Sequence, residues 1–123
     1  MSGVFVQQRL RGVLTSIAPV FDSVPVEAAA PYLVIGPDLS SDWSTKTSAG
    51  REHRVSVAVW DDAPGVARCK ALLAQVESAV SALAGTAGGQ RIASVLFLRS
   101  FTSRDPEGWS HGIAEFRIRT EEI

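Results

Sequence analysis

Two segments of the chain show an alternating pattern of side chains, and this pattern constrains the fold more than any other feature. In residues 51–60 (REHRVSVAVW), Val55, Val57 and Val59 alternate with Arg54, Ser56, Ala58 and Trp60. In residues 111–120 (HGIAEFRIRT), Ala114, Phe116 and Ile118 alternate with Glu115, Arg117 and Arg119. Successive side chains of a β-strand point to opposite faces, so each segment is predicted to be a strand with one apolar face.

Two further strands are predicted from short apolar runs. Residues 32–35 (YLVI) are followed by Gly36-Pro37, which is expected to end the strand. Residues 91–100 (RIASVLFLRS) have an apolar centre at positions 95–98. Both runs carry apolar side chains on both faces, and for residues 32–35 this favours an inner position in a sheet.

Two amphipathic helices are predicted from apolar residues that recur every three or four positions. The first occupies about four turns from Ser2, which can cap it. Its apolar side consists of Phe5, Val6, Leu10, Val13, Leu14 and Ile17. The second opens with residues 61–65 (DDAPG) and is expected to stop at Gly85, before a turn at Gly88-Gly89. Its apolar stripe consists of Val66, Cys69, Leu73, Val76, Val80 and Leu83.

The elements follow one another in the order helix, strand, strand, helix, strand, strand. This order predicts an α+β fold, with a small four-stranded, mostly antiparallel sheet and two helices packed on one face. A length of 123 residues fits one domain, so we expect residues 1–123 to form a single domain. The other face of the sheet, with Glu115, Arg117 and Arg119, is expected to face solvent or a partner.

Composition argues against several classes of protein. The chain is 46% hydrophobic and 20% charged with a net charge of −1, which argues against disorder and against a dedicated nucleic-acid binder. A single cysteine means that no internal disulfide can form. No apolar run reaches the ~20 residues that span a bilayer, and the first residues lack the pattern of a signal peptide. We therefore expect no membrane association and a cytoplasmic location where the chain is made.

The sequence contains no pattern typical of a catalytic, cofactor or metal site. The glycines of residues 85–89 follow a helix instead of preceding one, unlike those of a phosphate-binding loop. His53 and His111 lack further ligands at metal-binding spacing, although they could meet across a sheet edge. No Gly-x-Ser-x-Gly elbow marks a nucleophilic serine, and Cys69 lies on an apolar helix stripe. We therefore predict no catalytic residue, no cofactor and no metal.

Two polar stretches, residues 39–50 and 100–110, each contain a tryptophan. The first, with Trp43, is predicted to be a long loop or a protruding hairpin tip, and the second has a turn before Trp109. Each tryptophan either packs beneath its own loop or serves as a contact residue, because tryptophan and arginine are common interface anchors. The predicted partner interface therefore comprises Trp43, Lys46, Arg51, Arg104, Asp105, Trp109, Glu115, Arg117 and Arg119.

Residues 31–60 (PYLVIGPDLSSDWSTKTSAGREHRVSVAVW) resemble the central block of tail terminators, the small tail-completion proteins of tailed phages and gene transfer agents. The shared pattern is Pro-Tyr before an apolar strand, a polar tip with Asp-Trp-Ser-Thr-Lys-Thr, and a His-containing lead into a strand that ends in Trp. The resemblance continues through residues 20–25 (VFDSVP), the second helix, an Arg-Asp-Pro-x-Gly turn and a final strand with His-Gly near its start. It covers nearly the whole chain.

The resemblance implies a structural role without catalytic residues. A tail terminator forms a ring, generally a hexamer, that caps the finished tail tube and joins it to the stopper or connector of the head. The implied partners are therefore other copies of the chain, the tail tube protein and the stopper, and DNA would pass through the ring without specific binding. The implied location is the neck or tail top of the particle, reached from the host cytoplasm.

Two alternatives remain open from the sequence. One is a neighbouring ring of the same neck, namely a stopper or head-completion protein. The other belongs to a different class: a small α+β enzyme or ligand-binding protein that would use His53, His111 and a carboxylate.

Overall fold

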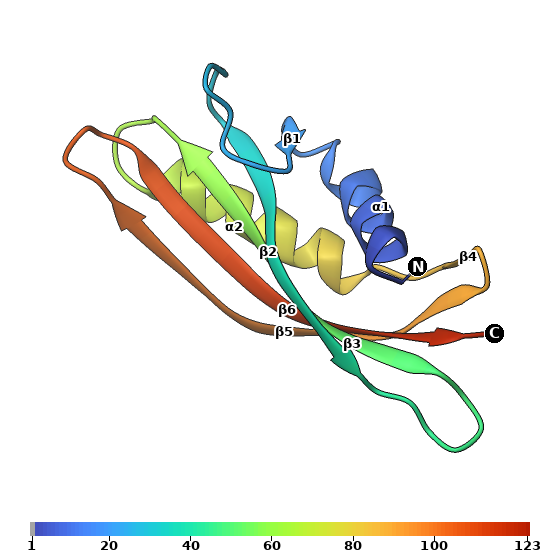
Figure 1. Cartoon of the computed structure of the whole chain (residues 1–123). Coiled ribbons are helices and arrows are strands. Elements are labelled where there is room, and N and C mark those ends of the chain that lie inside the picture. The colour runs from blue at the N-terminus through green and yellow to red at the C-terminus, as the bar shows by residue number, and fades with distance from the viewer. Residues whose placement is uncertain (1) are drawn as a thin grey trace.

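A curled sheet of six strands carries two helices on one of its faces (Figure 1). We describe residues 2–123 in a computed structural model of the chain. The elements in chain order are α1 (Ser2–Leu14), β1 (Val20–Phe21), β2 (Tyr32–Asp42), β3 (Gly50–Asp61), α2 (Ala67–Ser81), β4 (Thr86–Ala87), β5 (Gln90–Arg104) and β6 (Ser110–Glu122). The α+β class and the placement of both helices on one face agree with the sequence prediction.

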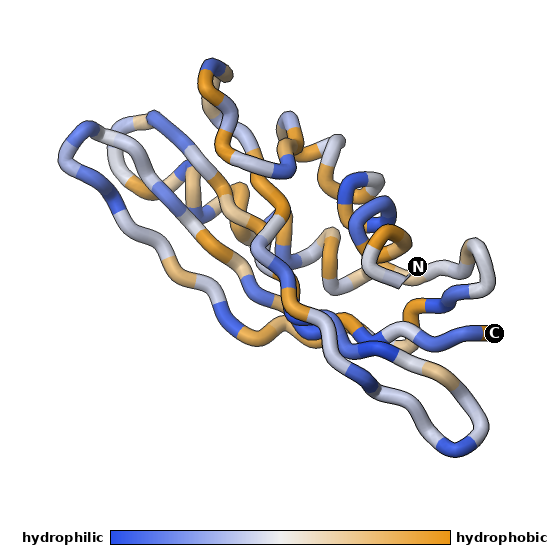
Figure 2. Tube along the Cα trace, in the orientation of Figure 1, coloured by the Kyte–Doolittle hydropathy of each residue, from blue (hydrophilic) through white to orange (hydrophobic). Residues whose placement is uncertain are grey.

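The centre of the sheet is an antiparallel ladder between β3 and β6. It runs without interruption from the pair Gly50 and Glu121 to the pair Asp61 and Ser110. The alternating residues of both strands therefore lie in register, and one set turns toward the helices. Val57, Val59, Ala114, Phe116 and Ile118 are fully buried there. Figure 2 shows this alternation as changes between orange and blue along the central strands.

The prediction of four strands is wrong in detail, because the sheet has the order β1-β2-β3-β6-β5-β4. The two additional strands, β1 and β4, have only two residues each, too few for a periodic pattern in the sequence. β1 pairs with β2 in parallel, so the sheet is mixed. β4 pairs with β5 through the predicted turn at Gly88 and Gly89, whose φ angles of 57° and 77° suit glycine in a tight hairpin.

The strands are longer than the sequence indicated. β2 does not end at Gly36-Pro37: its register shifts between Ile35 and Asp38, and the strand continues to Asp42. A bulge accommodates proline because it removes a position from the regular hydrogen-bond ladder. The polar stretch of residues 39–50 is therefore a protruding hairpin tip, and β5 similarly extends into the other polar stretch as far as Arg104.

Both helices contribute to one hydrophobic core with the inner face of the sheet. α1 ends at Leu14, before the predicted Ile17. α2 begins at Ala67, and its stripe is buried except at Val66, which is half-buried. The helix ends at Ser81, so the predicted stop at Gly85 lies beyond it.

Asp61 does not open the second helix, as the sequence suggested, but is the last residue of β3. Its side chain is fully buried and accepts a hydrogen bond of 2.9 Å from Nε of Arg68 in the first turn of α2. This hydrogen bond holds the pKa of Asp61 below its ordinary value, against the opposing effect of burial. The interaction ties the end of β3 to the start of the helix.

Phe116→Ala should lower the free energy of unfolding by about 3–5 kcal/mol, because it leaves a cavity in the centre of the core. Phe101→Ala is the matched control, since Phe101 lies on β5 with 47% of its surface exposed and Phe116 has none exposed. The control substitution should lower the free energy of unfolding by less than about 1 kcal/mol. Urea unfolding measures both values, and equal losses would contradict this placement of the core.

Asp61→Asn should lower the free energy of unfolding by about 1–3 kcal/mol at neutral pH, because a buried charge-assisted hydrogen bond is lost. The pKa of Asp61 is lower in the folded protein than in the unfolded chain, where it is ~3.9. Its carboxylate therefore stabilises the fold above about pH 4, and this contribution is lost as the pH falls through the folded-state pKa. The difference between wild type and variant should shrink in urea titrations below that pH.

Asp62→Asn is the control for this titration. Asp62 is exposed, and one of its carboxylate oxygens lies 3.4 Å from the guanidinium of the same Arg68. Exposed ion pairs contribute little to stability, so the free energy of unfolding of the variant should differ from that of the wild type by less than about 0.5 kcal/mol. Equal losses of unfolding free energy in the two variants would show that the burial of Asp61 does not strengthen its contribution to stability.

Candidate interaction surface

The face of the sheet opposite the helices carries a network of arginine and glutamate side chains, which we call the outer ion cluster. Its members come from the three long strands β3, β5 and β6, and cross-strand pairs place Glu52 beside Arg119, Arg54 beside Arg117, and Arg99 beside Glu115. The cluster consists of Glu52, Arg54, Arg99, Glu115, Arg117 and Arg119. It includes the three predicted residues Glu115, Arg117 and Arg119, which point away from the core as expected.

Positive charge is in surplus within the outer ion cluster. Three arginines surround the Glu52 carboxylate: Nε of Arg119 lies 3.0 Å from it, and the Nε atoms of Arg54 and Arg117 lie 3.8 Å from it. Among residues 2–123, Nε of Arg117 is buried without a hydrogen-bond partner. One carboxylate cannot neutralise three guanidinium groups, so this face suits an acidic partner surface.

Arg99 and Glu115 form a separate, forked pair on the same face. Nε and one terminal nitrogen of Arg99 donate hydrogen bonds of 3.0 and 3.2 Å to the two carboxylate oxygens. These bonds raise the pKa of Arg99, so the group stays charged. The arginine side chain is 69% exposed, which leaves the guanidinium accessible to another molecule.

The β2–β3 hairpin tip holds the first group of predicted contact residues. Trp43 is half-buried, and the guanidinium carbon of Arg119 lies 5.0 Å from the centre of its ring. Its backbone N–H donates to the carbonyl oxygen of Gly50, so the residue folds back on its own hairpin. Lys46 and Arg51 are exposed in the same hairpin, and Arg51 lies on the inner face of the sheet, which His53 shares.

The opposite end of the sheet carries an aromatic cluster on the outer face. Trp109 makes edge contacts with Tyr32 and Trp60, at ring-centre distances of 6.2 and 6.4 Å. His111 stacks on Trp60 at 4.0 Å. Trp109 is half-buried in this cluster, so it packs against β2 and β3 rather than beneath its own loop.

Arg104 and Asp105 order the β5–β6 turn. Arg104 donates hydrogen bonds to the carbonyl oxygens of Ala63 and Gly65, at 3.1 and 2.7 Å, which ties the turn to the segment before α2. The Asp105 carboxylate accepts the backbone N–H groups of Glu107 and Trp109 at 3.0 and 2.9 Å. These two predicted contact residues thus have a clear role within the fold, and their contact with a partner stays a prediction.

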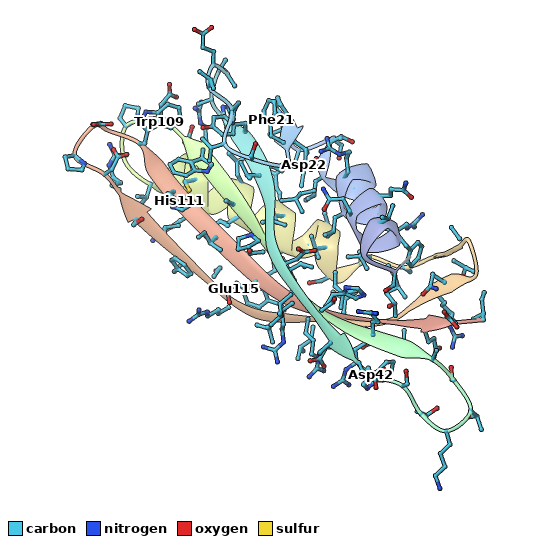
Figure 3. All side chains as sticks on the ribbon, viewed as in Figure 1. Phe21, Asp22, Asp42, Trp109, His111 and Glu115 are labelled. Carbon is cyan, nitrogen blue, oxygen red and sulfur yellow. The ribbon has the colours of Figure 1, made fainter. Side chains whose placement is uncertain are left out.

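The nine predicted residues therefore do not share one surface, because only Trp43 adjoins the three that lie in the outer ion cluster, through Arg119. Figure 3 shows Trp109 and His111 at one end of the sheet, Glu115 near its middle and Asp42 at the other end. The predicted interface missed Glu52, Arg54 and Arg99. The alternation of residues 51–60 could have placed Glu52 on the outer face with Arg54. The face of Arg99 could not be predicted in this way, because a register shift between Phe97 and Arg99 breaks the alternation of β5.

The two histidines do not form a common site. His53 is buried on the inner face with Nε2 3.2 Å from Oγ1 of Thr120, and burial, followed by the charge of Arg51, lowers its pKa. His111 lies on the outer face at the other end, and burial lowers its pKa as well. The idea that they meet across a sheet edge is therefore wrong.

The part of the chain that the structure describes also shows no group of metal ligands, no reactive thiol and no membrane-spanning helix. Within residues 2–123, no three His, Cys, Asp or Glu side chains are grouped so that they could hold a metal ion. Burial raises the pKa of the Cys69 thiol, which keeps it protonated in the core. Neither helix in these residues is long and apolar enough to cross a membrane.

Comparison with known proteins agrees with this geometry. Residues 6–121 match the family of tail completion protein gp17. The chain belongs to this family. It is also similar to a chain in the structure of the virion of a native gene transfer agent (GTA) particle, with 35% sequence identity and a TM-score of 0.75. That similarity covers 94% of this chain and 91% of the other. No curated protein matches. The family resemblance inferred from the sequence is thus confirmed.

Glu52→Gln should lower the free energy of unfolding by about 1 kcal/mol at low salt, because three arginines lose their shared carboxylate. The loss should become smaller at about 1 M NaCl, where the screening length falls to ~3 Å. Glu107→Gln, in the exposed β5–β6 turn, is the control and should leave the stability unchanged. A loss that does not depend on salt would show that packing, rather than charge, is the role of Glu52.

Proposed function

We propose that this protein is a tail terminator of a phage or gene transfer agent. Copies of the chain form a homohexameric ring at the neck, or tail top, of the particle. The ring caps the tail tube, ends its polymerisation and joins the tail to the stopper or connector of the head. It performs no catalysis, and DNA passes through it without specific binding.

The observation that carries this proposal is the likeness to a chain of a gene transfer agent virion over 94% of the length, together with the family match over residues 6–121. At 35% identity, such a likeness supports a shared role within a particle as well as a shared fold. Membership of a tail-completion family narrows that role to a protein that finishes a tail.

The structure offers surfaces for assembly rather than a pocket with reactive groups. The outer ion cluster presents surplus arginine charge on an exposed face, as an assembly interface requires for complementarity. The alternative of a small enzyme depended on His53, His111 and a carboxylate acting together. Those histidines lie on opposite faces, so this alternative loses its candidate site.

Deletion of the gene should yield tails longer than normal that are not joined to heads, because nothing stops tube polymerisation. Negative-stain electron microscopy of lysates measures tail length and the fraction of joined particles. A plasmid copy of the wild-type gene is the control and should restore both.

The same experiment separates the terminator from a neighbouring ring of the neck. A stopper or head-completion protein closes the head, so its loss would leave detached tails of normal length. Normal tail length in the deletion strain would therefore contradict a terminator and favour the stopper. Complete, infectious or gene-transferring particles would contradict both roles.

A further inference from the structure

Each edge of the sheet is free over part of its length. In the described residues, β1 covers β2 only at Leu33 and Val34, so the edge of β2 is open as far as Asp42. β4 covers β5 at Gln90 and Arg91, and the N–H of Ile92 donates to the carbonyl oxygen of Gly85, so the other edge is open from Ala93 onward. Open strand edges present unpaired N–H and C=O groups and are templates for pairing with another chain.

The open stretches also lie level with each other across the sheet. Leu39 pairs with Arg54, which pairs with Arg117, which pairs with Leu96. Leu39 and Leu96 therefore occupy the same row and the same face at opposite edges. They are 68% and 46% exposed, so each edge presents an apolar side chain that a second chain could cover.

Strand direction and charge favour a contact between unlike edges. β2, β3, β6 and β5 alternate in direction, so β2 of a second copy placed beside β5 would continue the antiparallel order. The open stretch of β2 contains Asp38 and Asp42 and no basic residue. The open stretch of β5 contains Arg99 and Arg104 and no acidic residue, so contact between two β5 edges would bring like charges together.

We infer that residues 38–41 of one copy pair with residues 94–97 of the next, so that the sheet continues from copy to copy with Leu39 against Leu96. This contact is head-to-tail, and head-to-tail contacts close into a ring when the rotation between copies permits it. The inference rests on the ring proposed above and names its subunit interface. It leaves the outer face of the sheet and the outer sides of the helices available to other partners.

The bulges set the limits of this pairing. β2 changes register between Ile35 and Asp38, where Pro37 also lacks an N–H group, and β5 changes register between Phe97 and Arg99. β5 also changes register between Ile92 and Ser94, so β5 is regular from Ser94 to Phe97 and β2 is regular from Asp38 to Asp42. The bulge after Phe97 ends the regular pairing before it reaches the level at which β1 occupies the edge of β2.

A disulfide cross-link tests the pairing directly. Leu39→Cys and Leu96→Cys are made as separate proteins, mixed and oxidised, with Cys69 left in place because it is buried. Within one chain the two positions are three strand spacings apart, about 14 Å, which is too far for a disulfide. The mixture should give a band at twice the mass of one chain, and neither protein alone should give it.

A second mixture provides the matched control. Phe101→Cys lies on the same exposed face of β5, five residues further along the strand, or about 17 Å away. Mixed with Leu39→Cys, it should give at least tenfold less cross-linked product. The double variant Leu39→Cys/Leu96→Cys, oxidised in solution and in assembled particles, should give a ladder of linked chains that ends at a closed ring.

The remaining outcomes separate this interface from the ring itself. Oligomers of unchanged mass without the mixed cross-link would overturn the interface and leave the proposed ring standing. Cross-linking of Leu96→Cys alone would show contact between like edges and would also overturn the interface. A chain that stays monomeric in solution and gives no ladder in particles would overturn both the interface and the ring.

Discussion

The pairing of β3 with β6 is the interaction on which the rest of the structure depends. The ladder is uninterrupted over the whole of β3, so every residue of one strand has a fixed partner on the other. A shift of one residue would turn Phe116 and Ile118 to solvent and bring arginines into the core. The cost of such a shift holds the register, and the register decides which side chains the helices cover and which remain on the outer face.

The charged face follows directly from this constraint. Because one set of alternating positions is used by the core, the other set of β3 and β6 faces away from the helices, and over part of the sheet it holds Glu52, Arg54, Glu115, Arg117 and Arg119. The long strands bring these side chains into one cluster rather than leaving them as isolated surface charges. The surplus of arginine comes from β5, which contributes Arg99, and from β6, which contributes two arginines and one glutamate.

Much of the fold could be predicted because it rests on local periodicity. Residues 51–60, residues 111–120 and both helices repeat their patterns over about ten residues or more, and short apolar runs indicated two further strands. The order of these elements was sufficient to predict an α+β sheet with helices on one face. The strand ends were harder to predict, because Gly36-Pro37 interrupts a pattern without ending the strand. β1 and β4 had no pattern at all, since two residues form a strand only where a neighbouring strand is already in place.

The sequence by itself determined which residues face the core, where the chain turns and to which family the protein belongs, because these depend on neighbours along the chain. Only the tertiary structure decided that Trp43 and Trp109 lie at opposite ends of the sheet, that His53 and His111 lie on opposite faces, and that Leu39 and Leu96 share one row. The physical reason is the insertion of β6 between β3 and β5. That pairing joins residues far apart in the chain, and local patterns carry no information about it.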